Sequence, residues 1–237
     1  MNEGDDNAVQ PPMLDLAGLL EALGMPSVGV PNAADRLFPR AAEEHGHARI
    51  VHDAVGGWFV YSSGYKDAAD IVVNQLKQSQ RQQDFLVYPV MFLYRHYLEL
   101  TIKGLIVVAW RLLDIAAEDD LQTHDIRHYW AMCQTLLREI SPGDSVEEQT
   151  QIGRLIDEFC KHDASSFAFR YPVTKPDKRT KERALTLDAL HIVDLQNVQG
   201  VIAKIAVFLS GAEVQIAYYM DCKSDMADYD GPHGSEV

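Results

Sequence analysis

The stretch between residues 84 and 114 most constrains the fold of this chain, because almost every residue in it is apolar. Polar residues interrupt its middle at four positions, which are Arg95, His96, Glu99 and Lys103. On a helix, where successive residues are about 100° apart, these positions share one arc of about 100°. A helix that is apolar elsewhere is buried between neighbours, and a charged strip on it is paired or lines a cavity. The sequence therefore predicts a buried central helix with one polar strip.

Apolar residues at helical spacing predict further helices on both sides of the central one. The expected helices cover residues 14–24, 64–78, 84–114, 123–140, 145–160 and 194–220. A short β-hairpin is predicted over residues 49–63, where Gly56-Gly57 separates two β-prone runs. Four to five long helices with short connections form an up-and-down bundle, so the predicted fold is mainly all-α.

The helix expected at 194–220 has the most regular pattern, with apolar residues at alternating spacings of four and three. This pattern is typical of a helix that packs lengthwise against partners. Thr123 and Ser145 are candidate N-caps for the helices that follow them. Gly200 and Gly211 lower helix propensity, so we expect close backbone contact at both positions.

Charge is distributed unevenly along the 237 residues, which carry a net charge of −14. Both ends are acidic, and the sequence predicts a flexible N-terminal segment over 1–48 with one short helix. A helical domain is expected over 49–220, followed by a disordered acidic tail over 221–237. This overall charge argues against a protein that coats nucleic acid non-specifically.

The charge bias reverses between residues 170 and 183, where cations outnumber acids. Within this basic segment, FAFRYP at 167–172 interleaves aromatic residues with Arg170. Either the aromatics anchor a lid over the bundle, or they form the base-stacking edge of a nucleic-acid site. The expected nucleic-acid-binding residues are Lys103, Arg170, Lys175, Lys178, Arg179, Lys181 and Arg183.

No feature of the sequence predicts a metal, a cofactor or a membrane span. Cys133, Cys160 and Cys222 lack metal-ligand spacing, which is typical of free thiols in a reducing cytoplasm. His124 and His128 could share a metal, but no further ligand stands at a diagnostic spacing. The start of the chain lacks the pattern of a signal peptide, and no run of 18 uncharged apolar residues occurs. We therefore expect a cytoplasmic protein.

The polar strip of the central helix supports two interpretations. Glu99 lies four residues from both Arg95 and Lys103, so both cations can form buried ion pairs that fix the packing of the helix. Alternatively, His96 exchanges protons while Arg95 or Lys103 binds a phosphate-like anion. We also expect Arg170 to point inward toward His96, Glu99 and His124, because an arginine pinned between aromatics is suited to meeting an anion.

Three segments carry a family resemblance: FLYRHYLELTIK at 92–103, HDIRHYWAMC at 124–133 and FRYP at 169–172. They resemble the HEPN superfamily, helical-bundle domains common in prokaryotic defence, toxin–antitoxin and RNA-processing systems. The resemblance extends over residues 64–220 and implies a helical bundle that is often dimeric. Many members are metal-independent ribonucleases, so it also implies RNA as a partner.

The chain departs from the ribonuclease signature of that family, which is Arg followed after four to six residues by His near the start of a late helix. The spacing occurs only for Arg40 with His45 and His47, far from the expected helix, and chance explains it. The resemblance then implies either an altered centre or a domain without a catalytic role. The candidate catalytic residues are Arg95, His96, Glu99, His124 and Arg170.

These observations leave three functions open. The first is a ribonuclease-like effector of a defence or toxin system, in which a ribose 2′-hydroxyl attacks and His96 or His124 serves as base or acid. The second is a non-catalytic interaction module that binds a partner protein, such as an antitoxin, or a nucleotide through the same polar strip. The third is a purely structural helical homodimer. Convergence of His and Arg side chains in an open cleft would favour the first.

Overall fold

The computed structural model describes residues 31–38, 48–78, 82–117 and 119–229. The chain divides into two units, residues 1–49 and 50–237, and the second contains all the helices described here. In chain order they are α2 (Gly57–Leu76), α3 (Gln83–Leu112), α4 (Ile126–Ile140), α5 (Val146–His162) and α6 (Leu195–Tyr229). The described part of the chain is therefore all-α, as predicted. The helix expected at 14–24 lies outside the described residues.

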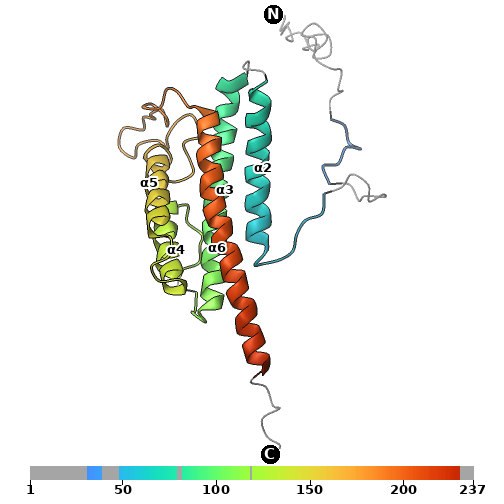
Figure 1. Cartoon of the computed structure of the whole chain (residues 1–237). Coiled ribbons are helices and arrows are strands. Elements are labelled where there is room, and N and C mark those ends of the chain that lie inside the picture. Colours follow the sequence, from blue (N-terminus) through green and yellow to red (C-terminus); the bar gives the residue numbers. More distant parts are fainter. Residues whose placement is uncertain (1–30, 39–47, 79–81, 118, 230–237) are drawn as a thin grey trace, which may run out of the picture. The chain divides into compact units, whose positions relative to one another are not determined.

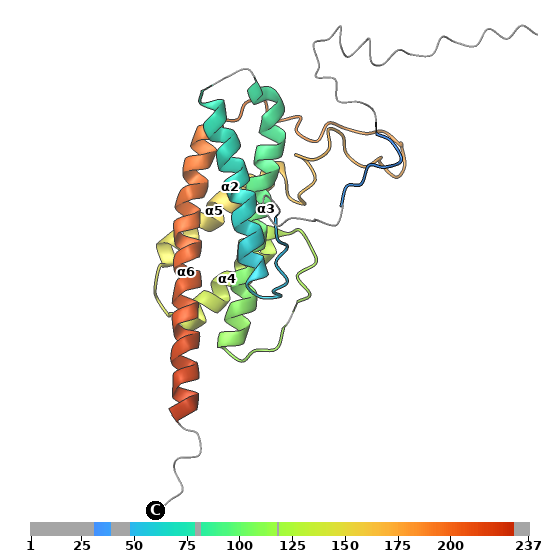
Figure 2. The ribbon, with the colours of Figure 1, turned by 90° about the vertical axis from the view of Figure 1, so that its right-hand side faces the viewer.

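α3 is the central helix of the bundle and contacts α2, α4 and α6. Figures 1 and 2 show α3 and α6 side by side, with α2 on one side of them and the α4–α5 pair on the other. Tyr94, Ile102 and Ile106 of α3 have no exposed surface, which confirms the predicted burial of this helix. These three neighbouring helices hold the polar strip of α3 inside the bundle.

The β-hairpin predicted over residues 49–63 is wrong, because Gly57 begins α2. Gly56 adopts right-handed helical dihedrals (φ −65°, ψ −22°), and the Asp53 carbonyl accepts the amide of Gly57 at 3.1 Å. The glycine pair therefore starts a helix instead of making a hairpin turn. The buried face of α2 continues across Gly64, from Ser62 to Ala69 and Val73. Alternation over a few residues could not reveal this helical face.

The disordered tail predicted over 221–237 is wrong for its described part, because α6 continues to Tyr229. Lys223 donates to the carbonyl of Leu112 at 2.8 Å and pairs with Asp114, at the C-terminal end of α3. A cation at that end of a helix is stabilising, since it meets the unpaired carbonyls of the last turn. These contacts of Lys223 stabilise the part of α6 that continues beyond the predicted end at residue 220. Residues 230–237 lie outside the described residues.

α6 is also long and apolar enough to cross a membrane, judged by length and composition alone. Within Leu195–Met226, the most apolar window of 18 residues has a mean hydropathy of 1.5. A helix of a protein core can have the same composition, and Ile202, Leu209 and Ile216 of α6 are buried in the bundle.

A Cβ at Gly200 or at Gly211 of α6 would meet nothing within 4 Å. The close backbone contact predicted for both glycines is therefore absent within the described residues.

Candidate functional site

Glu99 lies at the centre of a buried polar cluster on the strip of α3. Its side chain is 1% exposed, and Arg95 beside it is fully buried. Arg95 Nη1 donates to Glu99 Oε2 at 2.8 Å, and Lys103 Nζ donates to Oε1 at 2.8 Å. His124 Nδ1 lies 2.9 Å from the same Oε1. The predicted ion pairs of Glu99 with both cations are therefore present.

The remaining donors of the two cations hold the chain segments that flank α4 and α5. Lys103 Nζ donates to the carbonyl of Thr123 at 2.8 Å, just before α4. The carbonyls that accept from Arg95 are those of His124, Asp163 and Ala164. The cluster thus connects two loops to the central helix, and both cations donate to several acceptors inside the bundle. Lys103, predicted to bind nucleic acid, is buried and cannot reach an external phosphate.

The cations keep Glu99 ionised. Burial alone would raise the pKa of this carboxyl, but hydrogen bonds from Lys103 and His124 and the charges of Lys103 and Arg95 outweigh burial. The pKa of Glu99 is consequently below its usual value. One anion then faces two permanent cations, which is the arrangement expected of a buried network that fixes packing.

His96 lies outside this network, in a stack of aromatic rings. Its ring is stacked on Phe92 at 5.6 Å between centroids and meets Tyr65 edge-on at 4.5 Å. Burial lowers the pKa of His96; the charge of Glu99 opposes this effect, and the neighbouring cations add to it. His96 therefore packs as a neutral ring. Phe92 and Tyr65 were not predicted, although the spacing of four between Phe92 and His96 is a signal for such a pair.

Arg170 points toward α3 but meets aromatic rings rather than acids. Its Cζ lies 5.6 Å from the ring centroids of both Phe92 and Tyr171, and its Nε donates to the carbonyl of Ser166 at 2.5 Å. In the part of the chain that the structure describes, Arg170 makes no ion pair. The predicted convergence with Glu99 and His124 is wrong, because the ring contacts hold the guanidinium elsewhere.

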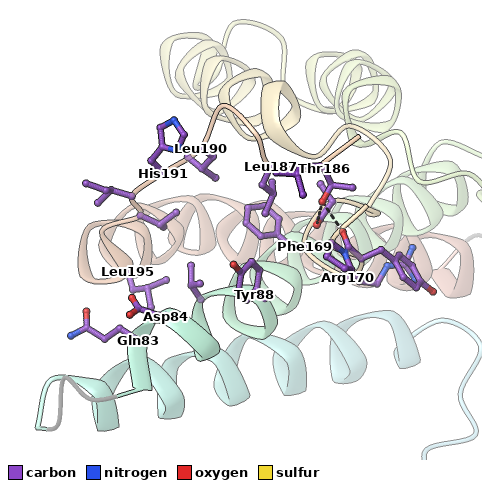
Figure 3. Close-up of a pocket in the computed structure, with 17 residues that line it drawn as sticks. Gln83, Asp84, Tyr88, Phe169, Arg170, Thr186, Leu187, Leu190, His191 and Leu195 are labelled. Carbon is purple, nitrogen blue, oxygen red and sulfur yellow. Dashed lines mark hydrogen bonds between the residues drawn. The ribbon is translucent and has the colours of Figure 1, made fainter. Parts of the chain in front are cut away.

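Arg170 borders a cavity of about 570 Å³ between the N-terminal end of α3 and the segment that follows α5. Figure 3 shows Arg170 at one end of it and Asp84 at the other, with Tyr88 and Phe169 between them. Its volume falls within the range of about 300–1,000 Å³ common for small-molecule sites. Phe169 and Arg170 belong to the segment predicted as a possible nucleic-acid site, whereas Asp84 and Tyr88 were not predicted, because no motif brings them to Arg170.

Residues 172–186 form a hairpin-shaped loop, here called the basic loop. Two backbone hydrogen bonds of 2.8 Å join its arms, from Thr174 to Ala184 and from Asp177 to Glu182. At the tip the Asp177 carboxylate accepts two backbone amides, which lowers its pKa. The cations that the loop exposes are Lys175, Lys178, Arg179, Lys181 and Arg183. Across the described ranges none of these five pairs with an acid.

His124 borders a second cavity, of about 390 Å³, between the start of α4 and the end of α5. Its side chain is 50% exposed, and Glu99 fixes its Nδ1. Asp125, and not the predicted Thr123, is the N-cap of α4; its carboxylate accepts two amides of the first turn. Arg127 also lines this cavity. Among the predicted catalytic residues, His124 therefore combines a fixed orientation with access to this cavity, as Arg170 does at the larger one.

The described residues contain no group of three or more His, Cys, Asp or Glu side chains that could hold a metal ion. His124 and His128, which share metal-ligand spacing, are held separately, by Glu99 and by Asp119 at 3.2 Å.

No protein-family model, curated protein or solved structure matches this chain.

Proposed function

We propose that this chain is a HEPN-like helical module that binds single-stranded RNA through the basic loop and the aromatic residues beside it. One observation carries this proposal: the loop presents five exposed cations without acid partners on a hydrogen-bonded backbone. Exposed cations on a fixed frame are suited to phosphates, because they release counterions when a strand binds and lose little backbone entropy.

The aromatic residues next to the loop supply a second element of a single-strand site. Phe167 and Tyr171 are stacked at 4.5 Å, and Tyr171 is 49% exposed. A base can stack on such a ring with little dependence on sequence, since every base has a π face. The guanidinium of Arg170, 5.6 Å from the same ring, is available to a phosphate.

The net charge of −14 supports a localised mode of binding. The acidic remainder of the protein repels a polyanion, so attraction is confined to the basic loop. We therefore infer that RNA meets one face of the molecule, in contrast to non-specific coating.

A direct test measures the affinity of the full chain for a fluorescent single-stranded RNA by anisotropy over a range of salt concentrations. Lys178→Ala/Arg179→Ala should weaken binding about tenfold and reduce the salt slope by about 1–2. The matched control is Arg154→Ala/Lys161→Ala, which removes the same charge from exposed positions of α5. Tyr171→Ala should weaken binding with an unchanged salt slope, because it removes stacking alone.

Two results would contradict RNA binding at this loop. One is a wild-type chain without measurable affinity at low salt. The other is an equal loss in the loop variant and in the α5 control, which would mean that only total charge matters.

A second candidate function, metal-independent RNA cleavage, is favoured by the pair of Glu99 and His124. A carboxylate on Nδ1 orients an imidazole so that its Nε2 can act as a base. In this mechanism Nε2 takes the proton of a ribose 2′-hydroxyl, whose oxygen then attacks the adjacent phosphorus. The bond to the 5′-oxygen breaks and water protonates that oxygen, which leaves a 2′,3′-cyclic phosphate and a 5′-hydroxyl. Arg127 lines the same cavity and pairs with Asp157 at 3.0 Å, and in this mechanism its guanidinium exchanges that carboxylate for the phosphate.

Incubation of the full chain with transfer RNA, with and without a chelator, separates the two candidates. Cleavage requires chelator-resistant fragments with cyclic phosphate ends that disappear in His124→Ala and persist in the control His128→Ala. RNA binding without fragments supports the non-catalytic module.

A further inference from the structure

The cavity of about 570 Å³ at the N-terminal end of α3 has mainly apolar walls. Val87, Leu187 and Leu190 line it and pack against the core of the bundle. Figure 3 shows the rings of Tyr88 and Phe169 in its middle. Such walls favour an apolar ligand, and the two rings favour a ligand that is itself aromatic.

Apolar side chains around the same cavity are left in water. Tyr88, Leu185 and Ile192 are 49%, 62% and 88% exposed, although all three line the cavity. Exposed apolar surface that gathers at a hollow is typical of a binding site. A ligand in the cavity would cover part of this surface, which is favourable.

The segment that forms one side of the cavity is held in place by its own hydrogen bonds. The buried carboxylate of Asp163 accepts the amides of Phe167 and Ala168 at 2.7 and 3.0 Å. The hydroxyl of Thr186 donates to the carbonyls of Tyr171 and Ala168 at 2.6 and 3.1 Å. A ligand therefore finds this side already formed and loses little affinity to ordering it.

Arg170 gives one end of the cavity a cation with donors to spare. The rings of Phe92 and Tyr171 lie beside its guanidinium, and its Nε donates to Ser166. Among the described residues no acid pairs with it and no acceptor takes its two Nη groups. A guanidinium held in this way presents its planar donors to a carboxylate, which matches them in shape and charge.

We propose that this cavity binds a small aromatic molecule with a single negative charge, such as an aromatic carboxylate. The anionic group meets Arg170, and the aromatic body lies along Tyr88 and Phe169. Asp84 at the opposite end repels an anion, so the ligand has one orientation and a second negative charge is disfavoured. This inference does not rest on RNA binding.

The first test uses two fluorescent probes that have the same rings, titrated into the full chain in the absence of RNA. Anilinonaphthalene sulfonate carries one negative charge, and N-phenylnaphthylamine carries none. Arg170→Gln should raise the Kd of the charged probe about tenfold and leave that of the neutral probe within about twofold. The matched control is Arg154→Gln, which removes the same charge from an exposed position of α5 and should change neither Kd.

A second variant tests the place of the aromatic body. Val87→Trp fills the cavity from α3 and should weaken both probes about tenfold, because both share the rings. The matched control, Ile71→Trp, places the same side chain at a 65% exposed position of α2 and should bind as wild type does. Circular dichroism verifies that every variant retains the helical fold.

A pair of competitors tests the charge at the far end. Naphthoate should displace the charged probe, whereas a naphthalene dicarboxylate with its charges at opposite ends of the rings should need about tenfold more. Asp84→Asn should remove that difference, because it takes away the opposing charge.

Four results would overturn the proposal. The first is a wild type that does not bind the charged probe, and the second is an equal loss of that probe in Arg170→Gln and Arg154→Gln. The third is a Val87→Trp variant that binds both probes as wild type does, which would place them elsewhere. The fourth is equal competition by naphthoate and the dicarboxylate in wild type.

Discussion

At the scale of single residues, the strip on α3 functions as a clamp. Glu99 is the sole acid between Arg95 and Lys103, and each cation also binds backbone carbonyls of loops next to α4 and α5. Buried ion pairs contribute little net stability when compared with apolar packing, but they make the position of each partner specific. The clamp therefore fixes where the loops lie, and with them His124.

Truncation of Glu99 tests the clamp. Glu99→Ala leaves two buried cations without their anion, so the free energy of unfolding should fall by about 3–5 kcal/mol. The matched control is Glu158→Ala, which breaks an exposed ion pair with Arg154 and should cost less than about 1 kcal/mol. Urea denaturation followed by circular dichroism measures both. Equal losses in the two variants would mean that solvent reaches the strip.

At the scale of elements, the contact between α2 and α3 depends on the absence of a side chain at Gly104. A Cβ there would lie 2.9 Å from Cβ of Trp58 and 3.1 Å from two ring atoms of Phe59. Backbone and near-backbone atoms cannot move away without shifting a helix. The N-terminal turn of α2 can therefore approach α3 this closely at residue 104 only because that residue is glycine.

The variant Gly104→Ala should destabilise the protein by about 1–3 kcal/mol, since overpacking outweighs the gain in helix propensity of about 1 kcal/mol. Gly64→Ala is the matched control within α2, where a Cβ would meet nothing within 4 Å. That change should stabilise the protein by up to about 1 kcal/mol. Thermal unfolding of both variants provides the comparison, and a more stable Gly104→Ala would show that α2 can shift without cost.

At the scale of the whole molecule, the bundle could be predicted because helical periodicity is a local property of the sequence. The apolar stretch at 84–114 and the apolar pattern at 194–220 each extend over many helical turns. A single residue that departs from the pattern therefore does not change the predicted helix. The hairpin prediction failed where only a few residues and the Gly56-Gly57 pair carried the signal. Lys223 ends up beside Asp114 through packing, which no local pattern can indicate.

The candidate site could be predicted only in part. The spacing of Arg95, Glu99 and Lys103 was sufficient to predict their pairing, because both steps lie on one helix. The position of Arg170 depends on Ser166 and on the ring of Phe92, which belong to different segments of the chain. Contacts between segments are set by tertiary packing, so the sequence could not predict that Arg170 is exposed and lies against the rings of Phe92 and Tyr171.

The pH dependence of global stability is the last consequence of this arrangement. The pKa of His96 in the folded protein lies below its ordinary value of 6.5, mainly because the ring is buried. The unfolded chain therefore binds a proton more readily, and the free energy of unfolding falls as the pH drops below about 6.5. The pKa of Glu99 is also lowered, from 4.5, so its contribution is present above about pH 4.5 and is lost as the pH falls through the folded pKa.

Urea denaturation of wild type, His96→Gln and Glu99→Gln separates the contributions of the two side chains to stability. The measurements run from pH 7.5 to pH 3.5, from about one unit above the ordinary pKa of His96 to about one unit below that of Glu99. His96→Gln should flatten the loss between pH 6.5 and pH 5, and Glu99→Gln should flatten the loss below pH 4.5. Arg95, Lys103 and His124 face His96 in wild type and in Glu99→Gln alike. Glu99→Gln also removes the charge that opposes the lowered pKa of His96, so it should not flatten the loss in the upper range. If the free energy of unfolding of His96→Gln runs parallel to that of wild type between pH 6.5 and pH 5, the imidazole is protonated as easily in the folded bundle as in the unfolded chain. The aromatic stack of Tyr65 and Phe92 would then not be the environment of His96 in solution.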